Sequence, residues 1–273
     1  MGWHVSVHAA CPSHEQVATI LRTLAAKQPL RGLRTDLSMQ DADCGRRRMI
    51  DFIELTQGRV IGYKAGLTNL QVQKRFGASS PVRGALFEKT LLDDGAAVPA
   101  DFGARPVFEA DLIVVVKDAA IHEARTHHDV LKSLSLVIPF IELPDLMIAA
   151  GEPVSGELIT FLNVGTKLGV VGKGIPVQPT AEFAAALANM HVVVLDETGK
   201  ELARGPGTAI LGHPLNAVLW LADDLRKSRI RLKPGDLLSL GAFSAPLRPT
   251  PGLAITVRYL GLPGDPAVGV RFR

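Results

Sequence analysis

The stretch RPVFEADLIVVVKD, residues 105–118, constrains this chain more than any other segment. Its apolar run predicts a buried β-strand, yet the run opens with two acids, Glu109 and Asp111. Side chains two positions apart in a strand point to the same face, here about 6–7 Å apart at a rise of about 3.3 Å per residue. Two like charges at that spacing raise the pKa of at least one of them. The pattern therefore predicts a positive group at the start of this strand.

A second apolar segment brings a third acid. SLVIPFIELPDLM, residues 135–147, is typical of a strand and carries Glu142, with Asp145 beyond it. Three carboxylates on two buried strands are costly unless they are paired or bound to a metal. Ligation by oxygen alone favours a hard cation such as Mg²⁺ or Mn²⁺ over Zn²⁺. The alternative interpretation is an edge strand whose acids face water.

Composition limits the function classes. The 273 residues carry 30 basic and 27 acidic side chains, and only 5% are aromatic, which argues against a nucleic-acid partner. No apolar run reaches the length of about 20 residues that spans a bilayer, so no membrane partner is expected. The expected strands are short and have few helices between them, which predicts a mixed α+β domain rather than a doubly wound sheet. They are Val107–Val116, Leu136–Ile141, Leu168–Val171, Val192–Leu195, Leu237–Leu240 and Ala254–Leu260.

The N-terminal part is expected to be helical. Ser13 and Gln16 have the spacing of a capping box, which begins a first helix. A second helix is predicted over about residues 38–55. Residues 13–58 would then form a helical arm, followed by one main domain over residues 59–273.

The sequence also predicts where two later helices begin. Thr68-Asn69-Leu70-Gln71 fits another capping box, and Gly77 would end the short helix that it opens. His213-Pro214 begins a helix near the C-terminus, because proline suits the first helical turn. We therefore interpret His213 as a helix-start residue rather than a ligand.

The two cysteines, Cys11 and Cys44, leave two interpretations open. Two cysteines alone make no zinc site; they are either free thiols in a cytoplasmic protein or a disulfide in an exported one. Val7-His8-Ala9 resembles a leader-peptide cleavage site, in which case residues 1–12 would be a leader remnant. A disulfide between the cysteines would close a loop of about 33 residues and stabilise the fold by roughly 3–4 kcal/mol.

Several motifs together resemble one known family. GYKAGLT (62–68), FEAD (108–111) and Ile141-Glu142 occur in the order seen in the fumarylacetoacetate hydrolase superfamily, in its branch of 2-oxopent-4-enoate hydratases and 4-oxalocrotonate decarboxylases. Residues 207–221 and the KPGD stretch at 233–236 are similar to its closing region. The resemblance covers about residues 15–260, and the combination is specific although each motif is not. It implies a mixed β-roll with an N-terminal helical arm, in a cytoplasmic homo-oligomer.

The resemblance also implies a site. Glu109, Asp111 and Glu142 would hold Mg²⁺ or Mn²⁺. Asp111 stands where the family usually has glutamate, so a water would complete its shorter reach. The implied substrate is a small 2-oxo or 2-hydroxy-dienoic acid that chelates the metal. Lys64 would be the catalytic residue, pairing with the substrate carboxylate or moving a proton.

The remaining implied contacts concern the substrate. Asn163 and Thr166 resemble the polar stretch that lines the family's pocket, and Arg83 or Lys167 would meet a second carboxylate on a diacid. The chain departs from the branch at Val82, where an acid usually follows the proline, and at Lys167, where a small residue is common. It also lacks the N-terminal His–Glu pair of the superfamily's C–C bond hydrolases.

These expectations add up to a metal-dependent hydratase. It would add water to a small 2-hydroxy-dienoate, as in meta-cleavage catabolism of aromatic compounds. Two alternatives stay open on the same site. One is a decarboxylase of a 2-oxo diacid, and the other is a catalytically weakened protein that binds 2-oxo acids, which the loss of an acid at Val82 would favour.

Overall fold

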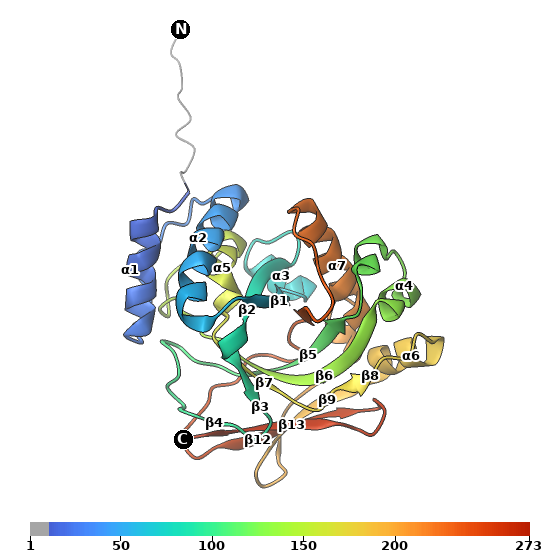
Figure 1. The fold of residues 1–273 in the computed structure, drawn as a ribbon. Helices are drawn as coiled ribbons and strands as arrows, with labels where there is room; N and C mark the ends of the chain where they lie inside the picture. The colour runs from blue at the N-terminus through green and yellow to red at the C-terminus, as the bar shows by residue number, and fades with distance from the viewer. Residues whose placement is uncertain (1–10) are drawn as a thin grey trace.

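The computed structural model describes residues 11–273, so the cleavage-like site at Val7–Ala9 lies outside the described residues. Within that range the strands form two sheets (Figure 1). The larger sheet has eight strands, of which β8 (Ile175–Pro176) pairs with β6 off the main path. Across the sheet the order is β2 (Val82–Phe87), β1 (Val60–Gly66), β11 (Leu237–Ser239), β5 (Glu109–Val116), β6 (Leu134–Leu143), β7 (Leu168–Val171) and β3 (Leu91–Asp93).

The second sheet is smaller. Its five strands run in the order β10 (Glu201–Pro206), β9 (His191–Asp196), β12 (Ala254–Leu260), β13 (Ala267–Phe272) and β4 (Ala97–Val98). Buried Tyr259 of β12 joins the two sheets, because its hydroxyl donates to the Asp111 carbonyl oxygen and accepts from the Phe140 amide at 3.0 Å. The second sheet thus packs directly behind the strands that carry the acids.

The large sheet is mixed and strongly curved, which gives the fold its roll (Figure 1). β5 and β6 are its longest antiparallel pair, while β1 runs parallel to β11. Alternating burial is absent from β5, whose Ala110–Val114 run is buried on both faces, as expected of a strand covered on both sides. The predicted mixed α+β roll is confirmed.

The N-terminal segment is helical. α1 (His14–Ala25) begins with the expected Ser13–Gln16 capping box, in which both reciprocal bonds form. α2 (Met39–Gln57) packs closely on α5 (Gly156–Phe161), since a Cβ added at Gly45 would lie 2.6 Å from the Phe161 ring. These three helices gather on one side of the roll (Figure 1). A disulfide joins Cys11 to Cys44, with their Cα atoms 5.6 Å apart.

The other helices correct one expectation and confirm another. α3 (Leu70–Arg75) is capped by Asn69 rather than Thr68, because the Asn69 side chain accepts from the Gln71 and Val72 amides. α7 (Pro214–Lys227) starts after His213 as expected, and the His213 imidazole caps it by accepting from the Leu215 amide at 3.0 Å. α4 (His127–Lys132) and α6 (Ala181–Asn189) were not predicted. In residues 11–273, no helix has both the length and the apolar character that crossing a membrane requires.

Candidate active site

The three acids lie on one face of the large sheet. Glu109 of β5 stands directly opposite Glu142 of β6, and Asp111 stands opposite Phe140. Opposite residues of an antiparallel pair share a face, as do residues two apart in a strand. Asp111 and Glu142 are buried and Glu109 is partly so. The interpretation of an edge strand with solvated acids is therefore wrong, because β5 lies between β11 and β6.

Lys64 supplies the positive group. It lies on β1, and its ammonium reaches Glu142, with which it forms a buried ion pair. It also donates to the Val164 carbonyl oxygen at 3.0 Å. The sequence predicted a positive group at the start of β5; the ammonium that lies there pairs with the third acid, Glu142, because β6 carries that acid within reach.

Burial perturbs both kinds of charge. It lowers the pKa of Lys64 to about 8, against the attraction of Glu109 and Asp111, which favours the charged ammonium. It also raises the pKa of Glu109 to about 7, with Lys64 opposing and Asp111 adding to the shift. An acid and a base that both titrate near neutral pH are suited to proton transfer.

Asp111 is held differently from the other two acids. Its Oδ1 accepts from the Gly241 amide at 2.9 Å and the Leu240 amide at 3.1 Å, and its Oδ2 accepts from the Ser239 hydroxyl at 2.5 Å. Burial raises the pKa of this carboxyl, whereas the Ser239 bond works against that rise. The short side chain is thus fastened to the end of β11, and a water between Asp111 and a metal stays a prediction.

The carboxylate oxygens of these acids are donors that suit Mg²⁺ or Mn²⁺, but the three side chains do not converge on one point. Two buried carboxylates and the partly buried Glu109 share a face with one buried ammonium, Lys64, so ionising all three acids would leave a net charge of −2 that a divalent cation balances. In the described part of the chain, however, no group of three or more acidic, imidazole or thiol side chains is arranged to hold an ion. The reason is local: Asp111 points to β11, and Lys64 already engages Glu142.

Beside this cluster lies a tight turn, Asn163–Gly165, with Thr166 directly after it. Asn163 is buried, and its amide both accepts from the Ala85 amide at 2.7 Å and donates to the Ala85 carbonyl at 3.1 Å. The Thr166 hydroxyl donates to the Asn163 carbonyl at 2.8 Å. Both side chains therefore have backbone partners, and substrate contact by either stays a prediction.

The side chain of Arg83 does not lie near the three acids. In the β1–β2 register it stands opposite Ala65, one position from Lys64, so its side chain leaves the other face of the sheet. There its guanidinium donates to Asp224 at 2.5 Å and Ser228 at 3.0 Å on the side of α7. Val82 pairs with Gly66 and so shares the face of Lys64, which makes the missing acid a change within the site.

Several residues that shape the site were not predicted from the sequence. Ser239 is fully buried between Lys64 and Asp111, and Tyr259 binds the backbone behind Asp111. A serine inside the apolar LLSL stretch was a usable signal, since a buried hydroxyl needs a partner. Asp224, the partner of Arg83, gave no signal because it is one of two adjacent acids on a helix.

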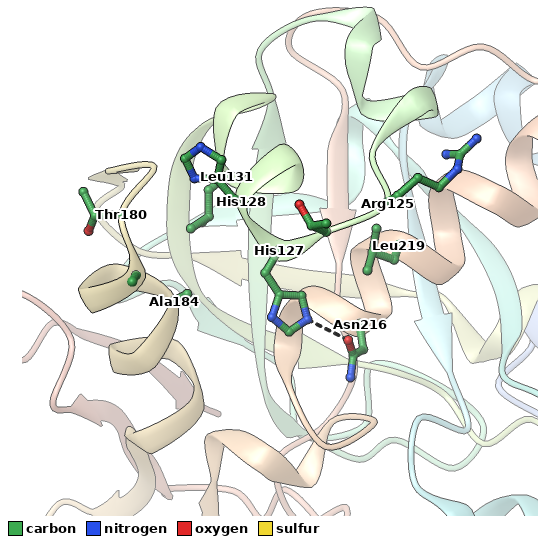
Figure 2. A pocket seen from close by; sticks show the side chains of 10 residues that line it. Arg125, His127, His128, Leu131, Thr180, Ala184, Asn216 and Leu219 are labelled. Carbon is green, nitrogen blue, oxygen red and sulfur yellow. Dashed lines mark hydrogen bonds between the residues drawn. The ribbon is translucent and has the colours of Figure 1, made fainter.

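A separate cavity of about 690 Å³ opens between α4, α6 and α7 (Figure 2). His127 on its wall bonds to Asn216 at 2.8 Å, and its ring lies 4.0 Å from that of His213. Leu131, Ala184 and Leu219 supply apolar wall. Neither Lys64 nor any of the three acids lines it, so the candidate active site is the cluster on β1, β5 and β6.

The curved sheet with acids on one face is a β-roll of the fumarylacetoacetate hydrolase type. The chain is 30% identical over 233 residues to 2-keto-4-pentenoate hydratase of Paraburkholderia xenovorans LB400, covering 82% of this chain and 81% of that protein. It is 28% identical over 206 residues to a 4-oxalocrotonate decarboxylase of Pseudomonas putida, covering 75% of each. The chain therefore belongs to the hydratase and decarboxylase branch of the fumarylacetoacetate hydrolase superfamily.

Solved structures agree on the fold. 4-Oxalocrotonate decarboxylase from Pseudomonas putida G7, complexed with magnesium and adipate, matches with a TM-score of 0.82 and 24% identity, over 97% of this chain and 100% of that one. No protein-family model matches the chain. Membership of this branch makes a lyase activity, hydration or decarboxylation, the general expectation.

Proposed function

We propose that this protein is a divalent-metal-dependent hydratase that adds water to a small 2-hydroxy-dienoate. One observation carries the proposal: three carboxylates share a face of the sheet with a single buried ammonium, Lys64. That charge imbalance is costly in a protein that only needs to fold. It is useful in one that binds a cation and an anionic substrate together.

Glu109 and Glu142 are the residues that would hold Mg²⁺ or Mn²⁺, with Asp111 behind them. When bound, the ion would supply Lewis acidity to the oxygen atoms of the substrate. The donor set supports this assignment because every ligand is a hard oxygen. The related decarboxylase complexed with magnesium supports it by analogy.

Lys64 would carry the proton. Its Nζ lies on the same face as the acids, and burial lowers its pKa to about 8, so near neutral pH it can both give up and recover a proton. Among the residues of β1 and β2, Lys64 is the titratable side chain on the face of the acids. Tyr63 and Arg83 point to the opposite face, and Val82 stands where the branch usually has an acid. Because Glu109, whose pKa is raised to about 7, would be a metal ligand, we assign proton transfer during ketonisation of the enol to Lys64 Nζ.

Arg83 favours hydration over decarboxylation. A diacid needs a positive partner for its second carboxylate, and the guanidinium expected to provide it is bound to Asp224 on the far face. Lys167, two residues before the Gly169 that pairs with Glu142, is the remaining candidate for such a contact. A site with fewer cations fits a small monocarboxylate better.

The test compares two substrates in the presence of Mg²⁺. Purified protein is given 2-hydroxypenta-2,4-dienoate or 2-oxohex-3-enedioate, and products are identified by NMR together with measured CO₂ release. We expect loss of the diene signal, formation of 4-hydroxy-2-oxopentanoate and no CO₂. Release of CO₂ from the diacid without hydration of the diene would establish the decarboxylase instead. Saturable binding of both acids without any product would establish the binding protein.

A further inference from the structure

We propose that the turn Asn163–Gly165 is a positioning device for Lys64 and that Asn163 is its anchor. The inference rests on the proposed function, in which Lys64 Nζ carries the proton. It gives the buried polar side chain of Asn163 a different task from contacting substrate. The side chain acts through the backbone of its neighbour, Val164, whose carbonyl oxygen accepts from Lys64 Nζ at 3.0 Å.

The backbone of this turn is strained. Asn163 has φ 52°, Val164 has φ 54° and Gly165 has φ 66°, so three successive residues lie in the left-handed region. Asparagine and glycine tolerate that region, but a β-branched residue such as valine is an outlier there. Such conformations persist where surrounding structure enforces them, and they gather at functional sites. Here the result is a carbonyl oxygen turned toward Lys64.

Two glycines make room for the turn on either side of Lys64. A Cβ at Gly66 would lie 2.4 Å from a Val164 methyl carbon. A Cβ at Gly84, which stands opposite Lys64 in the register, would lie 2.8 Å from the Asn163 carbonyl oxygen and 3.0 Å from Lys64 Cγ. Because larger residues at either position would push the turn away, both strands are shaped for its close approach.

The turn is fastened at both ends. On one side the Asn163 amide makes two hydrogen bonds to Ala85, filling an open backbone position of edge strand β2. On the other side the Gly165 carbonyl accepts from the Asp145 amide at 2.9 Å, just beyond the β6 strand that carries Glu142. The turn therefore spans from β2 to β6, with Lys64 between them.

This arrangement gives the ammonium two acceptors from different elements. Glu142 is the acceptor that a bound cation would engage, whereas the Val164 carbonyl stays with Lys64. The turn thus holds Lys64 Nζ in place when Glu142 exchanges its ion pair with Lys64 for a bound cation. Loss of the Asn163 anchor should release Lys64 even in a protein that remains folded.

The test measures how readily Lys64 is acylated, and separately the steady-state kinetics, in variants of Asn163. Asn163→Ala removes both bonds to Ala85, and Asn163→Asp keeps only the acceptor for the Ala85 amide. Thr160→Val is the matched control, because it removes one buried hydrogen bond, from the Thr160 hydroxyl to the Gly156 carbonyl at 2.9 Å, in the helix just before the turn. Acylation of Lys64 is followed by mass spectrometry, with exposed Lys27 as the internal reference.

We expect Lys64 in Asn163→Ala to be acylated about fivefold faster than in the wild type, since the turn opens locally. The kcat should fall on the order of 10- to 100-fold with KM nearly unchanged, because a misplaced catalytic group affects the chemical step. Asn163→Asp should lie between the wild type and Asn163→Ala, and it carries the test if the alanine variant does not fold. Equal acylation of Lys64 in the Asn163 variants and Thr160→Val would overturn the inference. Absence of any wild-type turnover would refute the proposed function alone, since the acylation comparison still decides the role of the turn.

Discussion

Replacement of Cys44 by serine should lower the free energy of unfolding by about 4 kcal/mol. The disulfide links Cys11 to Cys44 across a sequence separation of 33 residues. In the chain-entropy description, a loop of that length removes about 12 cal/mol/K from the unfolded ensemble, which is about 3.7 kcal/mol at 25 °C. Residual structure of the α1 segment in the unfolded chain would make the measured loss smaller.

The folded state should change little in this variant. Next to Cys44, Gly45 packs on Phe161, and Arg48 donates to the Pro12 carbonyl at 2.5 Å. These contacts hold the start of the described chain against α2 without the disulfide. The lost stability should therefore come from greater freedom of the unfolded chain, with the helical content of the native protein preserved.

The assay is equilibrium unfolding in guanidinium chloride followed by circular dichroism, on the wild type and Cys44→Ser, each with and without reductant. Reductant should move the wild-type midpoint to that of Cys44→Ser and leave the variant unmoved. A loss below about 1 kcal/mol would contradict the loop-entropy argument. A reductant effect on the variant would show that the shift has another origin.

Three further outcomes follow from the site and its surroundings. Asp111→Asn should cost about 1–3 kcal/mol of unfolding free energy, because it disturbs the buried bonds to β11. It should nevertheless weaken Mn²⁺ binding less than Glu109→Gln does; the reverse order in calorimetry would make Asp111 the principal ligand. Arg83→Met should cost about 1–3 kcal/mol of unfolding free energy, because it removes the hydrogen bonds from the buried guanidinium to Asp224 and Ser228. The KM for the dienoate should stay within about twofold of the wild type; a large rise in KM would place Arg83 at the substrate. Burial and the neighbouring His127 lower the pKa of His213, so below about pH 6.5 the unfolded chain binds a proton that the folded one does not, and stability falls as the pH drops. His213→Asn keeps a helix-start side chain and should flatten this pH dependence between pH 5 and 7 in thermal melts; an unchanged slope would contradict the assignment to His213.

Local patterns in the sequence were sufficient for several elements. The strand Ala254–Leu260 was predicted with the bounds that the structure has, because alternating apolar residues and flanking turns define it locally. The Ser13 capping box was also predictable, since its partners lie three residues apart. The shared face of Glu109 and Asp111 follows from strand geometry alone.

The remaining features depend on pairings between distant segments. β11 separates β1 from β5, so Ser239 comes to lie between Lys64 and Asp111 although more than 100 residues separate it from either in the sequence. The face of Arg83 depends on the β1–β2 register, and a shift of one residue would have reversed it. The fastening of Asp111 to β11 was missed for the same reason, because its donors come from residues 239–241.

The most direct measurement is the binding of Mn²⁺ by calorimetry in parallel with the loss of the diene absorbance of 2-hydroxypenta-2,4-dienoate. Wild type, Glu109→Gln and Glu182→Gln are compared, the last replacing an exposed acid on α6. We expect one Mn²⁺ per wild-type chain, turnover that chelator abolishes, loss of both in Glu109→Gln and retention of both in Glu182→Gln. Full Mn²⁺ affinity in Glu109→Gln, or wild-type turnover in the presence of chelator, would contradict this expectation.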